Sequence, residues 1–202
     1  EDAGQKDQAL TEARQWFTRM PDNVNALTTL LRLLVLQGAK PEALTTADEF
    51  LKRQLAALQK QIEGQQPPPS PQEREQRLQA VRIAILLATA SAFHKAQDFE
   101  EAARRAREVL SLDSNHLGAL LLLGEIALAR QQWDEALSTY NTILKLRPRH
   151  FVAGNNLAWI LAEKMQQPAQ ALAIVQDIWT GRSGLPPVAP ERLPGEFLDT
   201  IG

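Results

Sequence analysis

The stretch Asp98-Phe99-Glu100-Glu101-Ala102 has a similar counterpart 34 positions later, Gln132-Trp133-Asp134-Glu135-Ala136. Both stretches carry a polar residue, an aromatic residue, two acidic residues and an alanine in the same order. The alanine belongs to a series in which each member stands near the start of a run of apolar residues at helical spacing: Ala9, Ala43, Ala102, Ala136 and Ala171. The intervals in this series are 34, 59, 34 and 35 residues. A recurring period of this length predicts a repeat protein made of one supersecondary unit.

A second series of small or apolar residues has nearly the same intervals, 59, 34, 34 and 44, and consists of Leu31, Ala90, Gly124, Ala158 and Gly202. Residues 117–129 are almost wholly apolar, and apolar residues recur on one helical face over 134–146. Pro148 follows that second segment and ends it, whereas Pro41 and Pro168 stand in the first turn of such segments, where proline is tolerated. Each unit is therefore predicted to be a helix–turn–helix hairpin that stacks on its neighbours.

The composition of the 202-residue chain agrees with helices, because leucine and alanine dominate its 44% hydrophobic content and aromatic residues make up only 5%. A net charge of −2 argues against general binding to nucleic acid. The absence of cysteine excludes disulfides and thiolate metal sites. Every apolar run is shorter than a membrane span needs, so no direct membrane insertion is expected. The compartment stays open between cytoplasm and periplasm, and a start at Glu1 suggests a processed form or a piece of a longer chain.

A 34-residue hairpin with these small residues resembles the tetratricopeptide repeat (TPR) family. The best-matching unit, 117–150, has Leu120 and Gly124 in its first helix, then Ala136, Tyr140 and Pro148. The resemblance covers nearly the whole chain and implies an all-α fold: a right-handed superhelical solenoid of stacked antiparallel helix hairpins. Residues 155–159 resemble bacterial members of the family.

The whole chain, 1–202, is predicted to form a single solenoid. Its hairpins are expected at about 6–23 (partial), 24–63, 72–114, 117–148, 151–180 and 196–202 (partial). Because both ends lack half a repeat, the array is expected to continue beyond them. The 44-residue interval holds one extra residue before Ala171 and a proline- and glycine-rich loop over 180–195.

The 59-residue interval contains 25 residues more than one repeat, between Phe50 and Ile83. Helical spacing continues over 51–62 and 71–83, and the proline-rich segment 64–71 lies between them. This pattern predicts one extended hairpin with a loop at its tip. The extension is either a contact or oligomerisation element or a tolerated surface insertion.

Catalytic and phosphate-binding motifs are absent from the sequence, so the chain is not expected to be an enzyme, and neither a cofactor nor a metal is expected. His116 and His150 are one repeat apart and are interpreted as structural residues at equivalent corners. Arg104, Arg105 and Arg107 share a helix with several glutamates, and we interpret that charged run as a solvated face with local ion pairs.

The resemblance implies that first helices line the concave surface of the solenoid. Aligning the repeats places these residues in the groove as candidate peptide- or partner-binding residues: Asn25, Thr28, Thr29, Arg32, Leu87, Ser91, His94, Lys95, Leu121, Leu122, Glu125, Leu128, Asn155, Asn156, Trp159 and Glu163. Leu121, Leu122 and Leu128 are equally well explained as core residues. Trp159 either anchors a partner or covers the neighbouring unit. Asn156 falls where family members that grip extended peptides often carry asparagine. The basic residues that would hold a terminal carboxylate beside it are missing.

The sequence therefore predicts a non-catalytic protein-interaction scaffold that binds a protein or peptide segment in an apolar groove with a mixed rim. The alternative is a structural or assembly spacer of a larger multidomain protein, with the extended hairpin 51–83 as its oligomerisation or docking element. The oligomeric state is left open.

Overall fold

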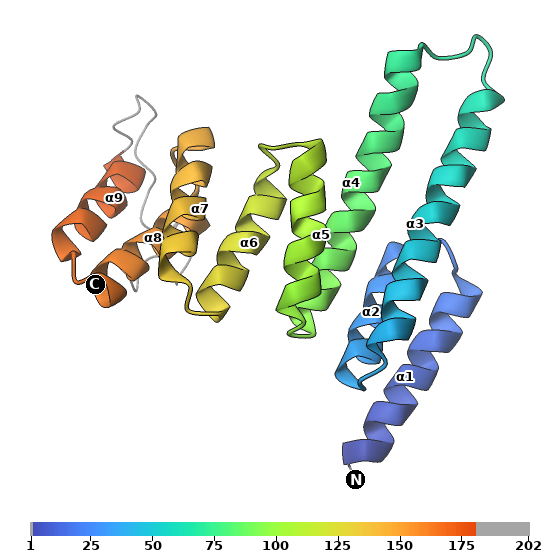
Figure 1. The fold of residues 1–202 in the computed structure, drawn as a ribbon, viewed down its shortest axis with the longest axis horizontal. Coiled ribbons are helices and arrows are strands. Elements are labelled where there is room, and N and C mark those ends of the chain that lie inside the picture. The colour runs from blue at the N-terminus through green and yellow to red at the C-terminus, as the bar shows by residue number, and fades with distance from the viewer. Residues whose placement is uncertain (1, 181–202) are drawn as a thin grey trace. The chain divides into compact units, whose positions relative to one another are not determined.

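The computed structural model describes residues 2–180, and in that range the chain forms nine α-helices and one π-helical turn, with no strand. The all-α prediction is confirmed. The elements in chain order are α1 (Asp2–Arg19), α2 (Val24–Leu36), α3 (Lys40–Glu63), α4 (Pro71–Lys95), α5 (Phe99–Leu112), α6 (Leu117–Ala129), α7 (Trp133–Leu146), α8 (Phe151–Trp159), the π-turn η1 (Ile160–Lys164) and α9 (Pro168–Thr180) (Figure 1).

The chain divides into two compact units between Ser114 and Asn115. Unit 1 contains α1 to α5, and unit 2 contains α6 to α9. Each unit is built of antiparallel hairpins, as the repeat pattern predicts. The single solenoid over 1–202 and its exact hairpin limits stay predictions. The expected loop after Thr180 and the partial helix 196–202, with Gly202, lie outside the described residues.

In unit 1, α2 packs against α1, α3 and α4, and α4 packs against α5. The apolar face of α2 is fully buried through Leu27, Leu31 and Leu34, and the aromatic rings of Phe50 and Phe93 are buried beside it. Each such side chain stabilises the fold by about 1.5–3 kcal/mol relative to an exposed one. The core of the unit is therefore a continuous layer between successive helices.

In unit 2, α6 packs on α7, α7 on α8, and α8 on α9. Two glycines allow these helices to approach closely. A Cβ added to Gly124 would lie 2.7 Å from Cε1 of Tyr140, and one added to Gly154 would lie 1.8 Å from Cδ1 of Ile178. The small residue at Gly124 in the second series is thus required by the aromatic ring that faces it.

The turns inside the hairpins repeat with the alanine series. Gly38, Gln97, Gln131 and Gln166 have positive φ angles of 78°, 62°, 58° and 56°, and each stands five residues before an alanine of the series. Those alanines are buried in all four hairpins. Since the backbone conformation and the burial recur together, the structure supports the repeat alignment derived from the sequence.

The extra residue expected before Ala171 lies within η1. A π-turn accommodates one more residue than an α-helical turn, and η1 continues α8 directly before the left-handed Gln166. The extra residue is therefore accommodated in the first helix of this hairpin, and the turn at Gln166 keeps the left-handed conformation of the other turns.

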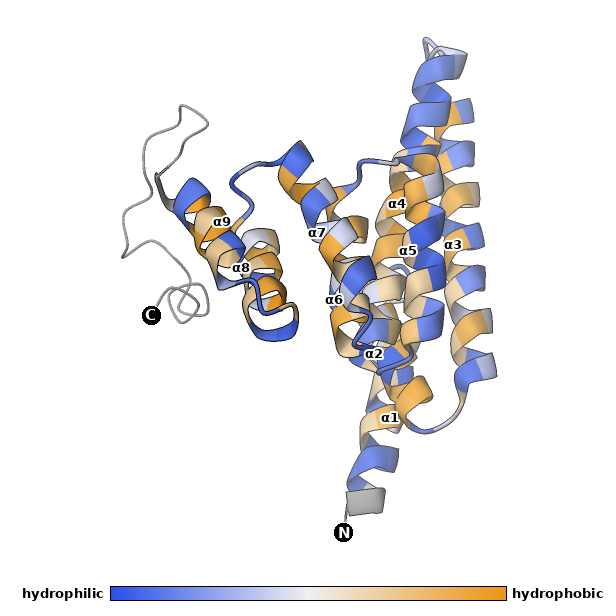
Figure 2. Cartoon of the chain, turned by 60° about the vertical axis from the view of Figure 1, so that its left-hand side comes forward, coloured by the Kyte–Doolittle hydropathy of each residue, from blue (hydrophilic) through white to orange (hydrophobic). Residues whose placement is uncertain are grey.

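The extended hairpin consists of the far ends of α3 and α4, which have 24 and 25 residues, against 13 or 14 in the helices α2 and α5 to α7. Ser70 and Glu73 form a capping box that starts α4, with Pro71 in its first turn. Hydrophobic residues alternate with hydrophilic ones along α3 toward this end (Figure 2). Ile62 is buried there, so the two helices hold each other beyond the repeat body.

His116 and His150 have equivalent structural roles at the corners between hairpins, as the sequence predicted. Nδ1 of His116 accepts from the backbone N–H of Ala119 at 3.3 Å, and Nδ1 of His150 accepts from that of Ala153 at the same distance. They are the N-caps of α6 and α8.

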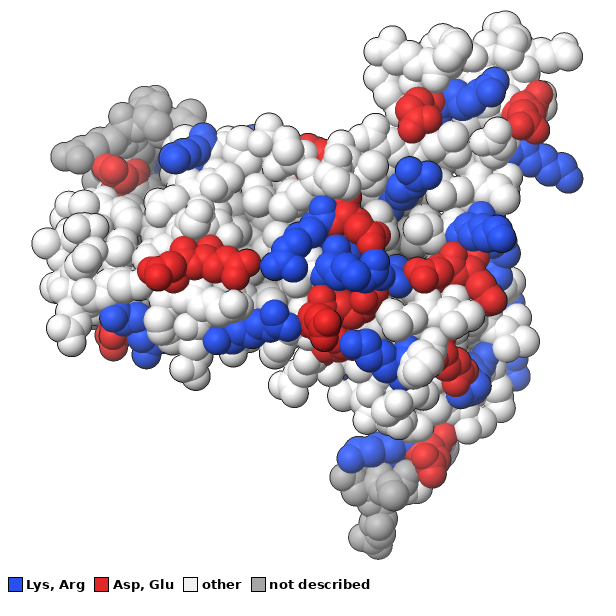
Figure 3. Space-filling model, viewed as in Figure 1, with Lys and Arg blue, Asp and Glu red and all other residues white. Residues whose placement is uncertain are grey.

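The interpretation of the arginine run as a solvated face is wrong for Arg105. Its side chain is only 1% exposed and donates to Glu101 on its own helix and to Asp48 on α3, at 2.7 and 2.8 Å. Its guanidinium also lies over the ring of Phe93. Arg104 and Arg107 are exposed, and charges of both signs mix over α5 (Figure 3). Sequence spacing placed these residues on one helix but could not show that α3 and α4 cover one side of it.

Candidate partner-binding site

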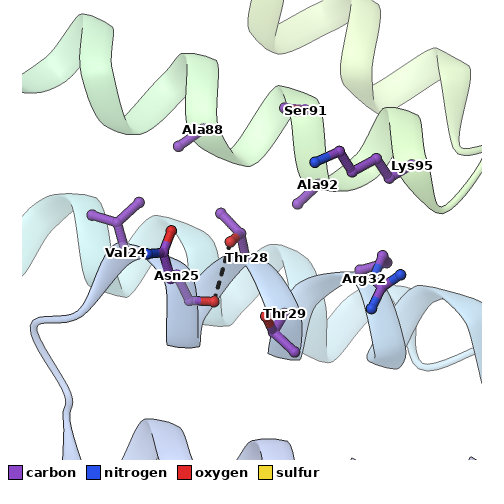
Figure 4. A pocket seen from close by; sticks show the side chains of 9 residues that line it. All are labelled: Val24, Asn25, Thr28, Thr29, Arg32, Ala88, Ser91, Ala92 and Lys95. Carbon is purple, nitrogen blue, oxygen red and sulfur yellow. Dashed lines mark hydrogen bonds between the residues drawn. The ribbon is translucent and has the colours of Figure 1, made fainter.

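A pocket of about 460 Å³ lies between α2 and α4, the first helices of two neighbouring hairpins of unit 1 (Figure 4). Helix α2 contributes Val24, Asn25, Thr28, Thr29 and Arg32, and helix α4 contributes Ala88, Ser91, Ala92 and Lys95. Residues three and four apart share a helix face, so both helices present one side to the pocket.

The pocket has an apolar base and a polar rim. Ala92 is buried and Ala88 is half-buried, whereas Asn25 and Arg32 are exposed. Thr28 Oγ1 donates to the backbone carbonyl of Asn25 at 3.2 Å, as the dashed line in Figure 4 shows. The amide of Asn25 can both donate and accept hydrogen bonds, and the hydroxyl groups of Thr29 and Ser91 can do the same.

One end of the pocket is basic. Arg32 of α2 and Lys95 of α4 lie at the same end in Figure 4. Neither has a carboxylate partner in the part of the chain that the structure describes. Lys95 stands in the last turn of α4, where the helix dipole favours a cation. The pocket therefore presents two positive charges that are free to meet an anionic group.

Six of the predicted groove residues come together here: Asn25, Thr28, Thr29, Arg32, Ser91 and Lys95. Leu87 and His94 are half-buried and do not line the pocket, and the His94 ring instead lies 5.6 Å from that of Phe99. The sequence reasoning missed Val24, Ala88 and Ala92. Ala88 stands three residues before Ser91, and Ala92 stands three residues before Lys95, so the sequence spacing could have indicated both, because residues at i and i+3 share a helix face.

The predicted groove residues of unit 2 have a different setting. Leu121, Glu125, Leu128 and Asn155 are half-buried and Glu163 is exposed. Leu122 is 6% exposed. Its assignment to the groove is therefore wrong, and the alternative reading of it as a core residue is confirmed. A hollow of about 320 Å³ in unit 2 is lined by other residues: Gln131, Gln132, Trp133, Asp134, Glu135 and Met165.

Asn156 already has a partner within unit 2. Its Nδ2 donates to the hydroxyl oxygen of Tyr140 at 3.0 Å, across the α7–α8 contact. Burial raises the pKa of Tyr140 well above its usual range, despite the opposing effect of this hydrogen bond. The amide that the sequence assigned to a bound peptide thus also joins two helices of the chain.

Trp159 is 38% exposed and contacts a second indole. Its ring lies edge-on to that of Trp133, with 6.0 Å between centroids, and the ammonium of Lys164 lies 4.8 Å from the Trp159 centroid. The same ammonium is 5.6 Å from the Trp133 centroid. The three side chains form a cation–π cluster that fixes one face of Trp159 within unit 2.

Comparison with known proteins agrees with the repeat geometry. Residues 93–160 match the family model described as tetratricopeptide repeat. These residues include the buried alanines, the left-handed turns and the facing glycine of two successive hairpins. The hairpins of residues 93–160 are therefore similar to tetratricopeptide repeats.

Two solved structures have a fold similar to that of this chain. The structure titled "Crystal structure of MamA protein" aligns with a TM-score of 0.51 at 14% identity, covering 93% of this chain and 91% of that one. Another, titled "Crystal structure of MamA", aligns with a TM-score of 0.50 at 15% identity and covers 86% of each chain. No curated protein sequence matches the chain. At these identities the likeness concerns the fold alone, and a bacterial source stays a prediction.

Two other types of site are absent from residues 2–180. Nowhere in that range do three or more histidine, aspartate or glutamate side chains gather so that they could hold a metal ion. None of its helices combines the length and the apolar character that crossing a membrane requires. Among the described residues, the pocket between α2 and α4 is the best-defined candidate site. Proteins with tetratricopeptide repeats are generally non-catalytic scaffolds for protein interactions.

Proposed function

We propose that this chain is a non-catalytic scaffold that binds an extended segment of a partner protein in the pocket between α2 and α4. The observation that carries the proposal is that Arg32 and Lys95, at one end of the pocket, have no carboxylate partner among the described residues, while the other polar groups of the pocket can bind a peptide backbone. The partner segment that we propose carries an acidic side chain, or a cluster of them, next to Arg32 and Lys95.

The polar groups support an extended backbone. Asn25 and Thr29 come from α2 and Ser91 from α4, so donors and acceptors stand on both walls. An extended peptide exposes its N–H and C=O groups to both sides and pairs with such walls. A helical segment satisfies its own backbone groups and gains little from them.

The apolar base supports short side chains in the centre of the segment. Ala88 and Ala92 leave room because their own side chains are small, and Val24 closes the far end as a 38% exposed apolar group. A volume of about 460 Å³ holds two or three side chains of a peptide and falls within the range of ordinary ligand pockets.

The test uses fluorescein-labelled 12-residue peptides and the full chain in an anisotropy titration. The peptides share an alanine-, serine- and leucine-containing frame and differ only in a central Glu-Glu, Gln-Gln or Lys-Lys pair. We expect the Glu-Glu peptide to bind at least tenfold more tightly than the Gln-Gln peptide, because charge-assisted hydrogen bonds to Arg32 and Lys95 are stronger than neutral ones. The preference is expected to weaken with added salt.

The double variant Arg32→Glu/Lys95→Glu is expected to reverse the order and favour the Lys-Lys peptide. Lys60→Glu is the matched control, since Lys60 is an exposed lysine of α3 outside the pocket. An unchanged Glu-Glu preference in the double variant, with helical content preserved by circular dichroism, would exclude this pocket as the acidic-peptide site.

A further inference from the structure

The hollow of unit 2 lies where the turn between α6 and α7 meets the turn between η1 and α9. Its volume of about 320 Å³ falls at the lower end of the range of ligand pockets. The lining consists of two carboxylates, an indole, a thioether and two amides, which belong to Asp134, Glu135, Trp133, Met165, Gln131 and Gln132. The hollow is therefore acidic and aromatic, and none of its lining residues is a cation.

The repeat explains why this junction between two hairpins is open. Trp133 stands three residues before Ala136 of the alanine series, and in α3 the same position is held by Lys40. Lys40 reaches Asp98, which stands four residues before the alanine of the next hairpin, and forms an ion pair of 2.8 Å with it. In unit 2 the position of Asp98 is held by Gln167. Since Trp133 and Gln167 cannot form an ion pair, no such pair closes the junction at the hollow.

The ion pair of unit 1 also shows which charge such a junction can hold. The hydrogen bond to Asp98 raises the pKa of Lys40, and the charges of Glu100 and Glu101 add to this effect, although burial opposes it. An ammonium is thus held between two hairpins by carboxylates. In unit 2 the carboxylates are on α7, and an indole stands where the ammonium would begin.

Two observations in unit 2 indicate that the hollow favours a cation. Asp134 is exposed and has no cationic partner among the described residues. The ring of Trp133 already attracts a cation, because the ammonium of Lys164 lies 5.6 Å from its centroid. That ammonium lies closer to Trp159, at 4.8 Å, and Lys164 does not line the hollow.

An arginine side chain fits this lining better than a lysine side chain. A guanidinium is planar, stacks on an aromatic ring and donates to several acceptors at once, whereas an ammonium is a strongly hydrated point charge. Asp134 offers two carboxylate oxygens, and Gln131 and Gln132 offer amide oxygens. The apolar stem of arginine can pack against the thioether of Met165.

We propose that the hollow formed by Trp133, Asp134 and Met165 binds an arginine side chain of a partner protein. The guanidinium stacks on the indole and donates to the carboxylate of Asp134, so that a cation from another chain occupies a junction that Lys40 occupies in unit 1. The inference is independent of the pocket between α2 and α4, whose lining has two cations and no carboxylate and selects the opposite charge.

The test follows the indole N–H signals of the full chain in a two-dimensional proton–nitrogen NMR spectrum. The chain has four tryptophans, and the variant Trp133→Phe assigns the signal of Trp133. The probes are blocked tripeptides with a central arginine, lysine or citrulline, because citrulline keeps the shape of arginine without its charge. We expect the arginine peptide to shift the Trp133 signal and to bind at least about threefold more tightly than the lysine peptide. The citrulline peptide is expected to leave the signal unchanged.

Two variants test the hollow itself. Asp134→Asn is expected to weaken binding of the arginine peptide at least about fivefold, because a charge-assisted hydrogen bond is lost. Met165→Lys is expected to abolish binding, because it places a cation of the chain in the hollow. Glu100→Gln is the matched control, since Glu100 holds the equivalent exposed position in α5 and its loss is expected to change nothing.

Dispersed indole signals in each variant show that the chain is folded. Equal shifts from the arginine and citrulline peptides, or no shift from either, overturn the proposal. An arginine response that survives both Asp134→Asn and Met165→Lys overturns it as well.

Discussion

Neighbouring hairpins are joined by charges in unit 1 and by aromatic and amide contacts in unit 2. In unit 1, Arg105 of α5 pairs with Asp48 of α3, at 2.8 Å. Lys40, the first residue of α3, pairs with Asp98, the N-cap of α5, also at 2.8 Å. In unit 2, Tyr140 of α7 accepts from Asn156 of α8 at 3.0 Å. The indoles of α7 and α8 add an edge-on contact to this hydrogen bond.

The residues that differ between the two units occupy equivalent positions of the repeat. Arg105 corresponds to Thr139, and Tyr140 corresponds to Ala106. The backbone of the hairpin is the same in both cases, with the same buried alanine and the same left-handed turn. Small residues at a few positions fix how closely the helices pack, so the side chains around them are free to supply different chemistry.

The charged junction of unit 1 gives the largest expected effect. Glu101→Ala leaves Arg105 buried with only Asp48, whose side chain is 65% exposed, as its anionic partner. Removing one member of a buried ion pair costs about 3 kcal/mol or more of unfolding free energy. We expect a loss of that size in urea denaturation followed by circular dichroism. Glu100→Ala is the matched control on the exposed side of the same helix, with an expected change below about 0.5 kcal/mol.

The dependence of the unfolding free energy on pH tests whether the effect of Glu101→Ala comes from the ion pair. Burial tends to raise the pKa of Glu101, but hydrogen bonds from Arg104 and Arg105 outweigh burial and lower the pKa below its ordinary value. A lowered pKa means that the carboxylate stabilises the fold fully above the ordinary glutamate pKa of about 4.3 and loses this effect as the pH falls through the lowered value. The stability gap between the wild type and Glu101→Ala is therefore expected to close at acid pH. A gap that stays constant down to pH 2 would contradict the ion-pair origin.

The amide contact of unit 2 gives a smaller expected effect. Tyr140→Phe removes the hydroxyl acceptor of Asn156, which costs about 1 kcal/mol of unfolding free energy. Tyr140 is the chain's one tyrosine, so its ionisation can be followed by absorbance at 295 nm. Burial raises its pKa, and the folded state therefore keeps the proton where the unfolded state loses it.

As a consequence, the wild type is expected to lose stability relative to Tyr140→Phe as the pH rises above the ordinary tyrosine pKa of about 10. Phenolate absorbance is expected to appear together with unfolding, followed in parallel by circular dichroism at 222 nm. Ionisation near pH 10 in a fully folded protein would show that Tyr140 is not buried as described.

The turns give the smallest expected effects, with opposite signs in the two units. Gln131→Gly in unit 2 relieves a left-handed non-glycine residue, which costs about 1–2 kcal/mol, but adds the flexibility of glycine to the unfolded chain. We expect a net stabilisation of about 0.5 kcal/mol. Gly38→Gln in unit 1 is expected to destabilise by a similar amount. Thermal melts of the two variants measure both, and equal signs would show that the turns are not equivalent.

The sequence alone predicted the hairpin register, and the reason is local. A first-turn proline such as Pro41 and a small residue in a packed helix each depend on the type of residue at one position. They recur with the period of the chain, so spacing alone revealed them. Six residues of the α2–α4 pocket followed from the same register, because residues on one face of adjacent first helices must lie near one another.

Only the tertiary structure decided which side chains are buried and with what they pair. Arg105 and the exposed Arg104 are neighbours in one charged run, and only the presence of α3 beside one of them separates a buried ion pair from a solvated one. Leu122 was assigned to a groove and lies in the core, and Asn156 is joined to Tyr140. Burial depends on which element covers a face, and that is a property of contacts between segments far apart in the chain.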